Sequence, residues 1–409
     1  MYGENWGLVV VALLVLGAIL GQSALLLIAV LLVTVLPVSW LWNRLVLRRV
    51  AYERSLTEQR VFAGETVDLS VSLANAKLLP IPWLKVEDLV PSDLELSGRS
   101  LGSSHIPRRN SLTHTTSLGP YEAMRWGYTI ECKKRGFFFF GPARLSSGDI
   151  FGLFQQDRED DSMDRLIVYP RVVDLPELGF PGKDPFGEQK AAQRLFEDPS
   201  RTIGVREYHP EDSMKRVHWK ATARQGDLQV KVYEPTITQQ LVVFLNVATF
   251  PQPWMGVNVG RQEQVISIAA STAFHATSRK FAVGLIANGS VPNSDQPIKV
   301  LPSRAPDQLT HILEALAAVT SFATSSIDQV LKAASPGLAW GATFVVITAV
   351  VTDQLLAEIM RLRDAGRRLV LVSTDPQFKD AGASGVTVYH LPETQIGFAG
   401  QWDGGQNGS

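Results

Sequence analysis

Apolar positions dominate the start of the chain. No charged residue lies between Glu4 and Arg44, and residues 6–42 are almost continuously apolar. A membrane-spanning helix needs about 20 apolar residues, so this stretch is too long for one upright span and has room for two short ones. Gly21-Gln22-Ser23 is the polar, helix-weakening point near its middle. We therefore expect a transmembrane helical hairpin over residues 1–43.

Two other structures are compatible with a long apolar stretch: a cleaved signal peptide and a single tilted helix. A signal peptide has a basic segment before its apolar core, and the residues before Trp6 contain none. The single tilted helix remains an alternative to the hairpin. Arg44, Arg48 and Arg49 follow the apolar stretch. Because basic residues stay on the cytoplasmic side of a membrane, we expect a multi-pass protein of the cell membrane with the bulk of the chain in the cytoplasm.

Residues 44–173 show the pattern of half-buried strands. Apolar and polar side chains alternate at residues 65–73 and again at residues 126–132. Turn residues such as Gly119-Pro120 and Gly141-Pro142 separate these short segments. Short alternating strands with regular turns are typical of a small β-sandwich or barrel, and we expect a β-sandwich domain over this range.

The pattern changes after this domain. Residues 174–200 are rich in Pro, Gly, Asp and Glu, which indicates a linker or long loop. Further on, apolar strands alternate with amphipathic helices, which predicts a parallel, doubly wound α/β sheet within residues 201–396. The Gly-rich residues 397–409 are expected to form a disordered tail. Strands are expected at 241–248, 281–287, 343–350, 368–373 and 386–391, and helices at 262–279, 307–322 and 352–365.

Composition and short motifs exclude several classes of function. The 409 residues include 39 Lys and Arg against 40 Asp and Glu, so the chain has no overall basic charge and we expect no nucleic-acid partner. The lone Cys132 cannot form an intrachain disulfide, which fits a reducing compartment. The sequence has no Walker A, GxGxxG or GxSxG motif and no paired histidines, so we expect no cofactor and no enzyme activity.

The densest polar stretch covers residues 197–236. It contains, in this order, Gly204, Arg206, Tyr208, Asp212, Arg216, His218, Trp219, Ala223 and Arg224. This order resembles the core motif of the domain of unknown function 58 family, in which Gly-x-Arg-x-Tyr precedes an Asp-centred turn, Arg-x-Ile/Val-His/Asp-Trp and Ala-Arg. The segments 80–88, 135–154 and 168–172 resemble the upstream part of that family, so the resemblance covers nearly the whole chain.

The resemblance implies a bacterial membrane-anchored protein, often encoded beside a MoxR-type AAA+ ATPase, with a von Willebrand factor A-like domain at its C-terminal end. In that domain an Asp-x-Ser-x-Ser sequence after the first strand binds Mg²⁺ through oxygen ligands. The matching positions here are Asn246, Ala248 and Phe250, which supply one neutral carbonyl oxygen. We therefore expect a degenerate site that binds no metal, in a domain that keeps the von Willebrand factor A-like fold without the ion.

The polar residues of the core motif have two interpretations. Three guanidinium groups can clamp a phosphate or carboxylate, and His218 could move a proton. Alternatively, Arg206 and Arg216 pair with Asp212 or Glu207 and hold a turn, while the aromatic rings pack as anchors. Motifs of Arg, Asp and Trp of this kind often join two domains. We favour the structural or interface role. The candidate residues are Arg206, Tyr208, Asp212, Arg216, His218, Trp219 and Arg224.

These observations together predict a membrane-anchored, non-enzymatic scaffold or adaptor that interacts with other proteins. The family resemblance implies that it works with a MoxR-type AAA+ ATPase in protein assembly or maturation. The alternative is a ligand sensor or an enzyme that acts on a phosphorylated or cell-envelope substrate through the Arg/His/Asp core motif.

Overall fold

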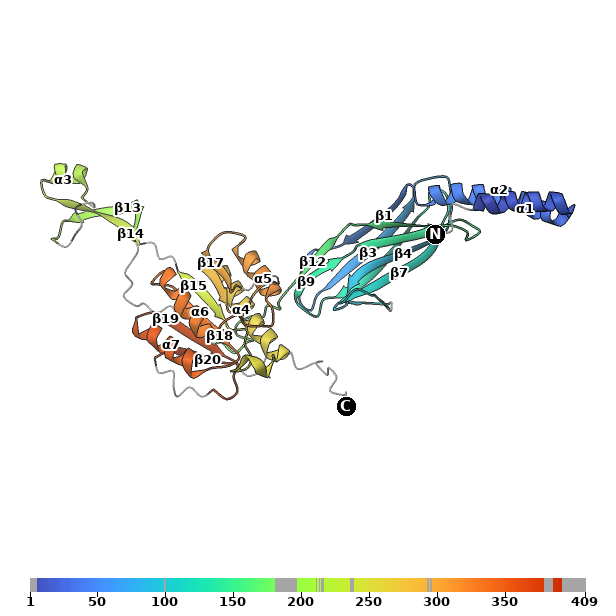
Figure 1. Ribbon diagram of the computed structural model, residues 1–409. Coiled ribbons are helices and arrows are strands. Elements are labelled where there is room, and N and C mark those ends of the chain that lie inside the picture. Colours follow the sequence, from blue (N-terminus) through green and yellow to red (C-terminus); the bar gives the residue numbers. More distant parts are fainter. Residues whose placement is uncertain are drawn as a thin grey trace. The chain divides into compact units, whose positions relative to one another are not determined.

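The computed structural model has two compact units, Met1–Tyr169 and Pro170–Ser409, which are described separately (Figure 1). The second unit begins a few residues before the boundary expected from the sequence. The structure describes residues 6–98, 101–180, 197–210, 212, 214, 217–235, 239–292, 294, 296–378 and 385–391.

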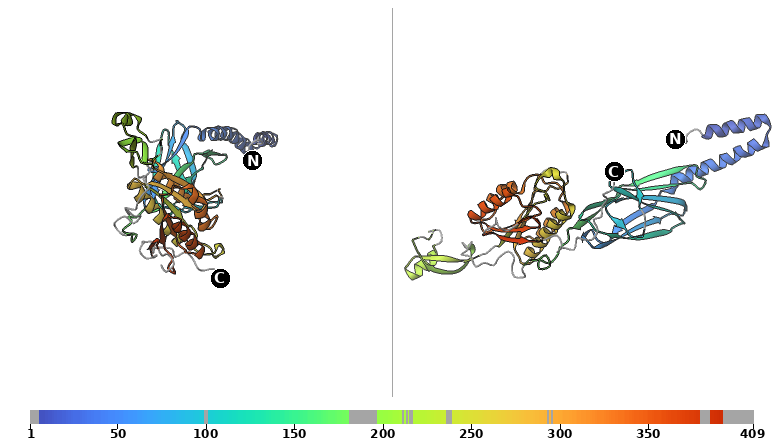
Figure 2. Two further views of the ribbon diagram at one scale, coloured as in Figure 1. Left: turned by 90° about the vertical axis from the view of Figure 1, so that its left-hand side faces the viewer. Right: turned by 90° about the horizontal axis from the view of Figure 1, so that it is seen from below.

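Two apolar helices open the first unit. Helix α1 covers Trp6–Leu20 and helix α2 covers Ser23–Val46, and they lie side by side (Figure 2). Gly21, with φ of 62°, separates them. The 24 residues of α2 extend about 36 Å, more than the roughly 30 Å of a bilayer core. The 15 residues of α1 extend only about 22 Å. Within the described residues, α2 is the helix that is long and apolar enough to cross a membrane.

The rest of this unit is rich in β-structure. A four-stranded antiparallel sheet has the order β1-β3-β8-β5, a five-stranded antiparallel sheet has the order β11-β10-β4-β7-β6, and a three-stranded mixed sheet has the order β2-β12-β9. The strands are β1 (Val50–Leu56), β2 (Arg60–Phe62), β3 (Thr66–Asn75), β4 (Ile81–Pro91), β5 (Glu95–Leu96), β6 (Gly102–Ser103), β7 (Arg109–Leu118), β8 (Ala123–Glu131), β9 (Gly136–Phe140), β10 (Ala143–Gly148), β11 (Gln155–Asp160) and β12 (Asp164–Tyr169).

One hydrophobic core joins the three sheets. The alternating residues of β3 bury their apolar face, as with Leu69, and leave polar residues on the other. Leu84 from β4 and Phe140 from β9 join the same core and are fully buried. Burying a large apolar side chain stabilises a fold by about 1.5–3 kcal/mol, so this shared core accounts for the association of the sheets.

A buried polar cluster crosses this core. The guanidinium of Arg54 on β1 donates to Asp88 Oδ1 on β4 at 2.6 Å and to Asp164 Oδ2 on β12 at 2.8 Å. It also donates to the carbonyl oxygens of Phe140 and Ser162. The hydroxyl of Tyr52 donates to Asp88 Oδ2 at 2.7 Å. Arg54 therefore connects strands from all three sheets, and neither it nor Asp88 exposes any side-chain surface.

The second unit contains a six-stranded α/β sheet. Its order is β17-β16-β15-β18-β19-β20, and every neighbouring pair is parallel except β16–β17. Helices α4 and α5 pack together on the sheet, and so do α6 and α7. The elements are β15 (Gln240–Leu245), α4 (Val259–Ser278), β16 (Ala282–Ala287), β17 (Ile298–Ser303), α5 (Gln308–Ala318), α6 (Ile327–Ala334), β18 (Thr343–Thr348), α7 (Asp353–Asp364), β19 (Arg368–Ser373) and β20 (Thr387–His390), with 3₁₀ turns at Pro253–Met255 and Ser335–Gly337.

The predicted linker or long loop at residues 174–200 is a loop where its start is described, but its end belongs to a strand. Leu175, Leu178 and Phe180 are buried, and the Phe180 ring lies 5.0 Å from that of Tyr389, because these apolar side chains find a place on the α/β unit. At the other end, strand β13 already begins at Glu197. Residues 181–196 between them, and the predicted tail, lie outside the described residues.

Candidate functional site

The core motif forms an extension that we call the arm: β13 (Glu197–Glu207), helix α3 (Trp219–Gln225), β14 (Gln229–Pro235) and their described connections. The two strands pair antiparallel. The Tyr208 N–H donates to the carbonyl oxygen of Leu228 and closes the strand ends. Gly226 ends α3 in a left-handed conformation with φ of 84°, which favours glycine.

Arg206 and Asp212 form a two-pronged ion pair inside the arm. Arg206 Nη1 donates to Asp212 Oδ2 at 2.7 Å, and Nη2 donates to Oδ1 at 2.6 Å. The His209 N–H donates to Oδ2 as well, at 2.9 Å. The Arg206 hydrogen bonds, followed by the one from His209, lower the pKa of Asp212 to about 2. The pair thus holds the turn after β13, within one segment and not between two domains.

The remaining motif residues have separate local roles. His218 is the N-cap of α3, because its Nδ1 accepts from the Ala221 N–H at 3.1 Å. Arg224 lies in the last turn of α3, where a cation interacts favourably with the helix dipole. Tyr208 is half-buried. Arg216 lies outside the described residues.

Trp219 corrects one expectation from the sequence. We expected its indole to pack as an anchor, but 65% of the residue is exposed. The reason is the size of the element: α3 has 7 residues and buries none of them. Other apolar side chains of the arm are exposed as well, namely Val205, Met214 and Leu228. Exposed apolar groups that gather on one small element mark an interaction site, and Trp and Arg are enriched among residues that dominate protein–protein binding.

A second candidate is a cleft at the carboxyl ends of the parallel strands. The chain winds from β15 through β16 to β17 on one side, and then crosses to β18 on the other. Ligands of open α/β sheets bind at such a reversal of strand order. A cavity of about 370 Å³ lies there, and its lining includes Asn246, Asn288, Thr324, Asp328 and Thr352.

A neutral hydrogen-bond network occupies the base of this cleft. The Asn246 Nδ2 group donates to Thr348 Oγ1 at 2.9 Å, and Asn246 Oδ1 accepts from Asn288 Nδ2 at 2.8 Å and from the Ala248 N–H at 3.1 Å. Asn246 and Asn288 are both buried. The side chains of Ala248 and Phe250 line the cavity without offering an oxygen.

These donors do not fit a divalent cation. Mg²⁺ is held by carboxylates together with water or phosphate oxygens, whereas the Asn246 oxygen is neutral and already accepts two hydrogen bonds. In the part of the chain that the structure describes, no three His, Cys, Asp or Glu side chains are grouped to hold a metal ion. Sequence reasoning missed Asn288 and Thr348. The one sequence signal for these two residues is their position: Thr348 ends the apolar strand β18, and Asn288 directly follows the apolar strand β16.

The fold and these sites define a class: a protein with an apolar N-terminal helix, a β-rich unit, and an α/β unit that carries a polar arm. Residues 204–395, somewhat less than half of the chain, match the family described as "Protein of unknown function DUF58", so this part of the chain is similar to that family. It is 24% identical over 363 residues to the uncharacterized protein YeaD of Bacillus subtilis (strain 168), covering 86% of this chain and 82% of that protein.

Similarity to solved structures is low. The CARDB domain of the PF1109 protein from Pyrococcus furiosus shares 13% identity at a TM-score of 0.20, covering 29% of this chain and 91% of that one. The sporulation control protein Spo0M from Bacillus subtilis shares 13% identity at a TM-score of 0.18, covering 29% of this chain and 49% of that one. At such TM-scores neither similarity informs the function of this chain.

Proposed function

We propose that this protein is a membrane-anchored, non-enzymatic adaptor that presents its arm to a partner protein. The exposed Trp219 is the main support for this role. The Arg206–Asp212 pair fixes the turn of the arm, and His218 caps α3, so these polar groups hold the arm in shape. A shaped arm with an exposed indole suits protein recognition, because Trp loses little conformational entropy for the area it buries.

The anchor is α2, and we propose that α1 enters the membrane beside it as the second arm of a hairpin. Arg44, Arg48 and Arg49 at the end of α2 support a cytoplasmic position for the remainder of the chain. A cysteine introduced at Ser409 should then react with an impermeant maleimide only after cells are permeabilised. Labelling of intact cells would contradict this orientation.

We propose further that the α/β unit is a degenerate von Willebrand factor A-like domain. Its support is the sheet order, in which the chain winds outward in both directions from the central β15 and ends one side with the antiparallel β17. The cleft after β15 is the position at which the related fold binds its metal. In this chain a neutral amide network replaces the carboxylate there.

The partner that the family resemblance supports is a MoxR-type AAA+ ATPase, with a role in protein assembly or maturation. The test measures binding of such an ATPase from the same bacterium to the full-length protein in nanodiscs. Trp219→Ala should weaken binding about 30-fold or more, since removing a central interface Trp typically costs about 2 kcal/mol or more. Its thermal stability should stay unchanged.

The matched control is Trp254→Ala, because Trp254 is also highly exposed but lies outside the arm. This variant should bind like the unmodified protein. Equal binding by all three proteins would rule out the arm as the docking site.

The rival function is a ligand sensor or an enzyme, and one observation favours ligand binding: the cleft volume of about 370 Å³ lies within the range of small-molecule sites, about 300–1,000 Å³. A sensor gains stability from its ligand by mass action. Thermal unfolding with inorganic phosphate and with cell-envelope precursors tests this. A concentration-dependent rise that Asn288→Ala abolishes would favour the sensor over the adaptor.

A further inference from the structure

Three loops leave the β-rich unit at the end where α2 enters it. We call residues 76–80, 119–122 and 149–154 the loop platform. Strand β1 begins shortly after α2 ends, and its first residue, Val50, pairs with Asn75 at the end of β3. Ile81 pairs with Leu118, so the loops before β4 and after β7 start from neighbouring positions.

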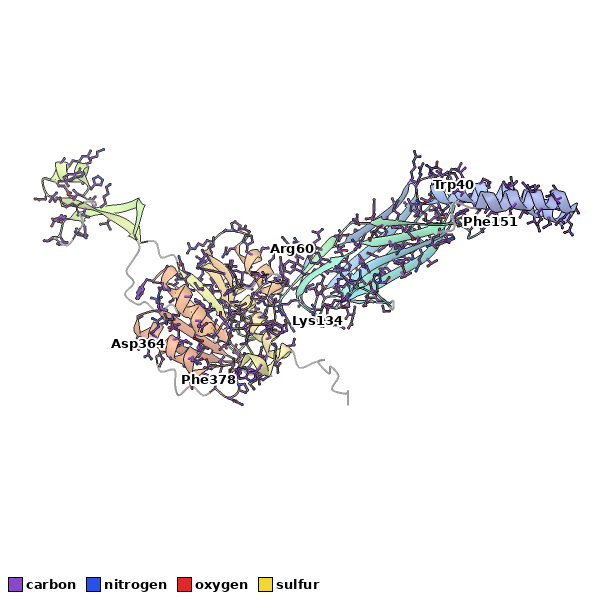
Figure 3. The ribbon with its side chains drawn as sticks, in the orientation of Figure 1. Trp40, Arg60, Lys134, Phe151, Asp364 and Phe378 are labelled. Carbon is purple, nitrogen blue, oxygen red and sulfur yellow. The ribbon has the colours of Figure 1, made fainter. Side chains whose placement is uncertain are left out.

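The third loop starts from the same edge. Ser147 near the end of β10 pairs with Leu84 near the start of β4, so the β10–β11 loop also leaves the sheet at this end. Figure 3 shows Phe151 of this loop and Trp40 of α2 at the same end of the unit. Helix α2 contacts both β10 and β11.

Internal hydrogen bonds give the loop platform a fixed shape. Asn75 Nδ2 donates to the carbonyl oxygens of Leu79 at 3.0 Å and Gly119 at 2.8 Å, which ties the first two loops together. In the third loop the buried Asp149 accepts from the backbone N–H groups of Phe151 at 3.0 Å and Phe154 at 2.6 Å. The loops are therefore pre-organised before any contact with a ligand.

The tips of these fixed loops are apolar and exposed. Five large side chains of the loop platform each have at least 50% of their surface in solvent: Leu78, Tyr121, Ile150, Phe151 and Leu153. Solvated loops normally carry polar tips, so this concentration marks a surface that is covered in use. Aromatic and aliphatic side chains of this kind are found at the boundary between lipid headgroups and acyl chains.

The position of α2 identifies what covers the apolar tips of the loop platform. Lys77 Nζ donates to the carbonyl oxygen of Val46 at 2.7 Å, and Arg158 donates to those of Leu47 at 3.1 Å and Val50 at 2.8 Å. These bonds tie the end of α2 to the sheets, so a membrane crossed by α2 lies next to the loop platform. The exposed Arg48 and Arg49 add charges that suit anionic headgroups.

We propose that the loop platform inserts its apolar tips into the lipid leaflet from which α2 emerges, and so holds the β-rich unit against the membrane surface. This inference rests on the proposed membrane anchor. The bilayer itself covers the loop platform, because the loops continue the membrane-facing surface that begins with α2. A second protein molecule on the same loops is an alternative that the experiment separates.

The test places an environment-sensitive fluorophore on Phe151→Cys in the full-length protein in nanodiscs that contain phosphatidylcholine and phosphatidylglycerol. Cys132 should remain unlabelled, because it is buried and burial raises its pKa to about 11. The label should be quenched by nitroxide on lipid headgroups and upper acyl chains, at a depth of about 5–10 Å.

Two further labels make the result decisive. Leu27→Cys, in the second turn of α2, reports whether the anchor is in the bilayer. Met163→Cys places the label at a similarly exposed apolar position beyond the other end of β11. We expect quenching at positions 27 and 151 and none at 163. Quenching at 27 without quenching at 151 would overturn this inference and leave the anchor intact, whereas no quenching at 27 would refute the anchor itself. A blue-shifted label at 151 that lipid nitroxide does not quench would show a protein occupant instead.

Discussion

Replacing Arg54 with methionine should destabilise the β-rich unit strongly. The fully buried guanidinium connects β1 to β4 and β12 and also donates to two backbone carbonyl oxygens. Without it, the fully buried Asp88 carboxylate keeps only the Tyr52 hydroxyl as a donor. Removing one partner of a buried ion pair costs about 3–5 kcal/mol because the other charge is left uncompensated.

Hydrogen exchange measured by mass spectrometry is the suitable assay, because peptides from β3 and β4 report opening of this unit alone. A loss of 3–5 kcal/mol at about 1.4 kcal/mol per tenfold change corresponds to roughly 100- to 4,000-fold faster exchange. The matched control is Arg144→Met on β10. Arg144 also pairs with a carboxylate, Asp157, at 2.7 Å, but 60% of its side chain is exposed.

An exposed pair contributes about 0–1 kcal/mol, so Arg144→Met should change exchange less than tenfold. Equal effects of the two substitutions would refute the reasoning, because burial of the pair would then not decide its contribution. Near-native exchange in Arg54→Met would do the same.

Three further outcomes are expected. The Asp212 carboxylate should titrate near pH 2 by NMR, so the stability it gives the arm is present above about pH 4 and is lost as the pH falls through 2. Arg206→Gln should raise this pKa toward its ordinary value of about 3.9, short of which the remaining His209 N–H bond holds it, and an unchanged pKa would exclude the pair as the cause. Asn246→Ala should lower the free energy of unfolding by about 1–3 kcal/mol, because it leaves buried amides without partners. Calorimetry on the unmodified protein should show no Mg²⁺ site tighter than about 1 mM. Gly141→Ala should abolish folding of the β-rich unit, because Gly141 has a φ of 93° and an added Cβ would clash with the Ser162 carbonyl oxygen. Gly127→Ala should fold normally, because open space surrounds Gly127, and similar circular dichroism melts of the two variants would contradict this.

The local pattern of apolar and polar residues was sufficient to predict those strands that are either continuously apolar or strictly alternating. The continuous apolar residues of β15 and β18 and the alternation in β3 indicate their structure directly. Strand β17 was missed because it is a half-exposed edge strand that contains Lys and Pro. Helix α6 was missed because its 8 residues are too few for a clear periodic pattern.

Contacts distant in sequence could not be predicted in this way. Arg54 and Asp88 are 34 positions apart, and nothing local distinguishes them from surface charges. The pairing of Arg206 with Asp212 was one of the options that the motif suggested, since both lie on one turn. Trp219 is exposed because the small arm has too few residues to cover its indole. The order of residues in the sequence does not reveal this.

The adaptor role of the arm is tested most directly by crosslinking from the arm itself. A photoreactive phenylalanine analogue at position 219 of the full-length protein would be activated in its native membrane, with the same analogue at position 254 as the control. Our account expects an adduct with a MoxR-type AAA+ ATPase from position 219 and not from position 254. An adduct confined to the chain's own α/β unit would contradict it, because Trp219 would then be an internal packing residue and not a docking site.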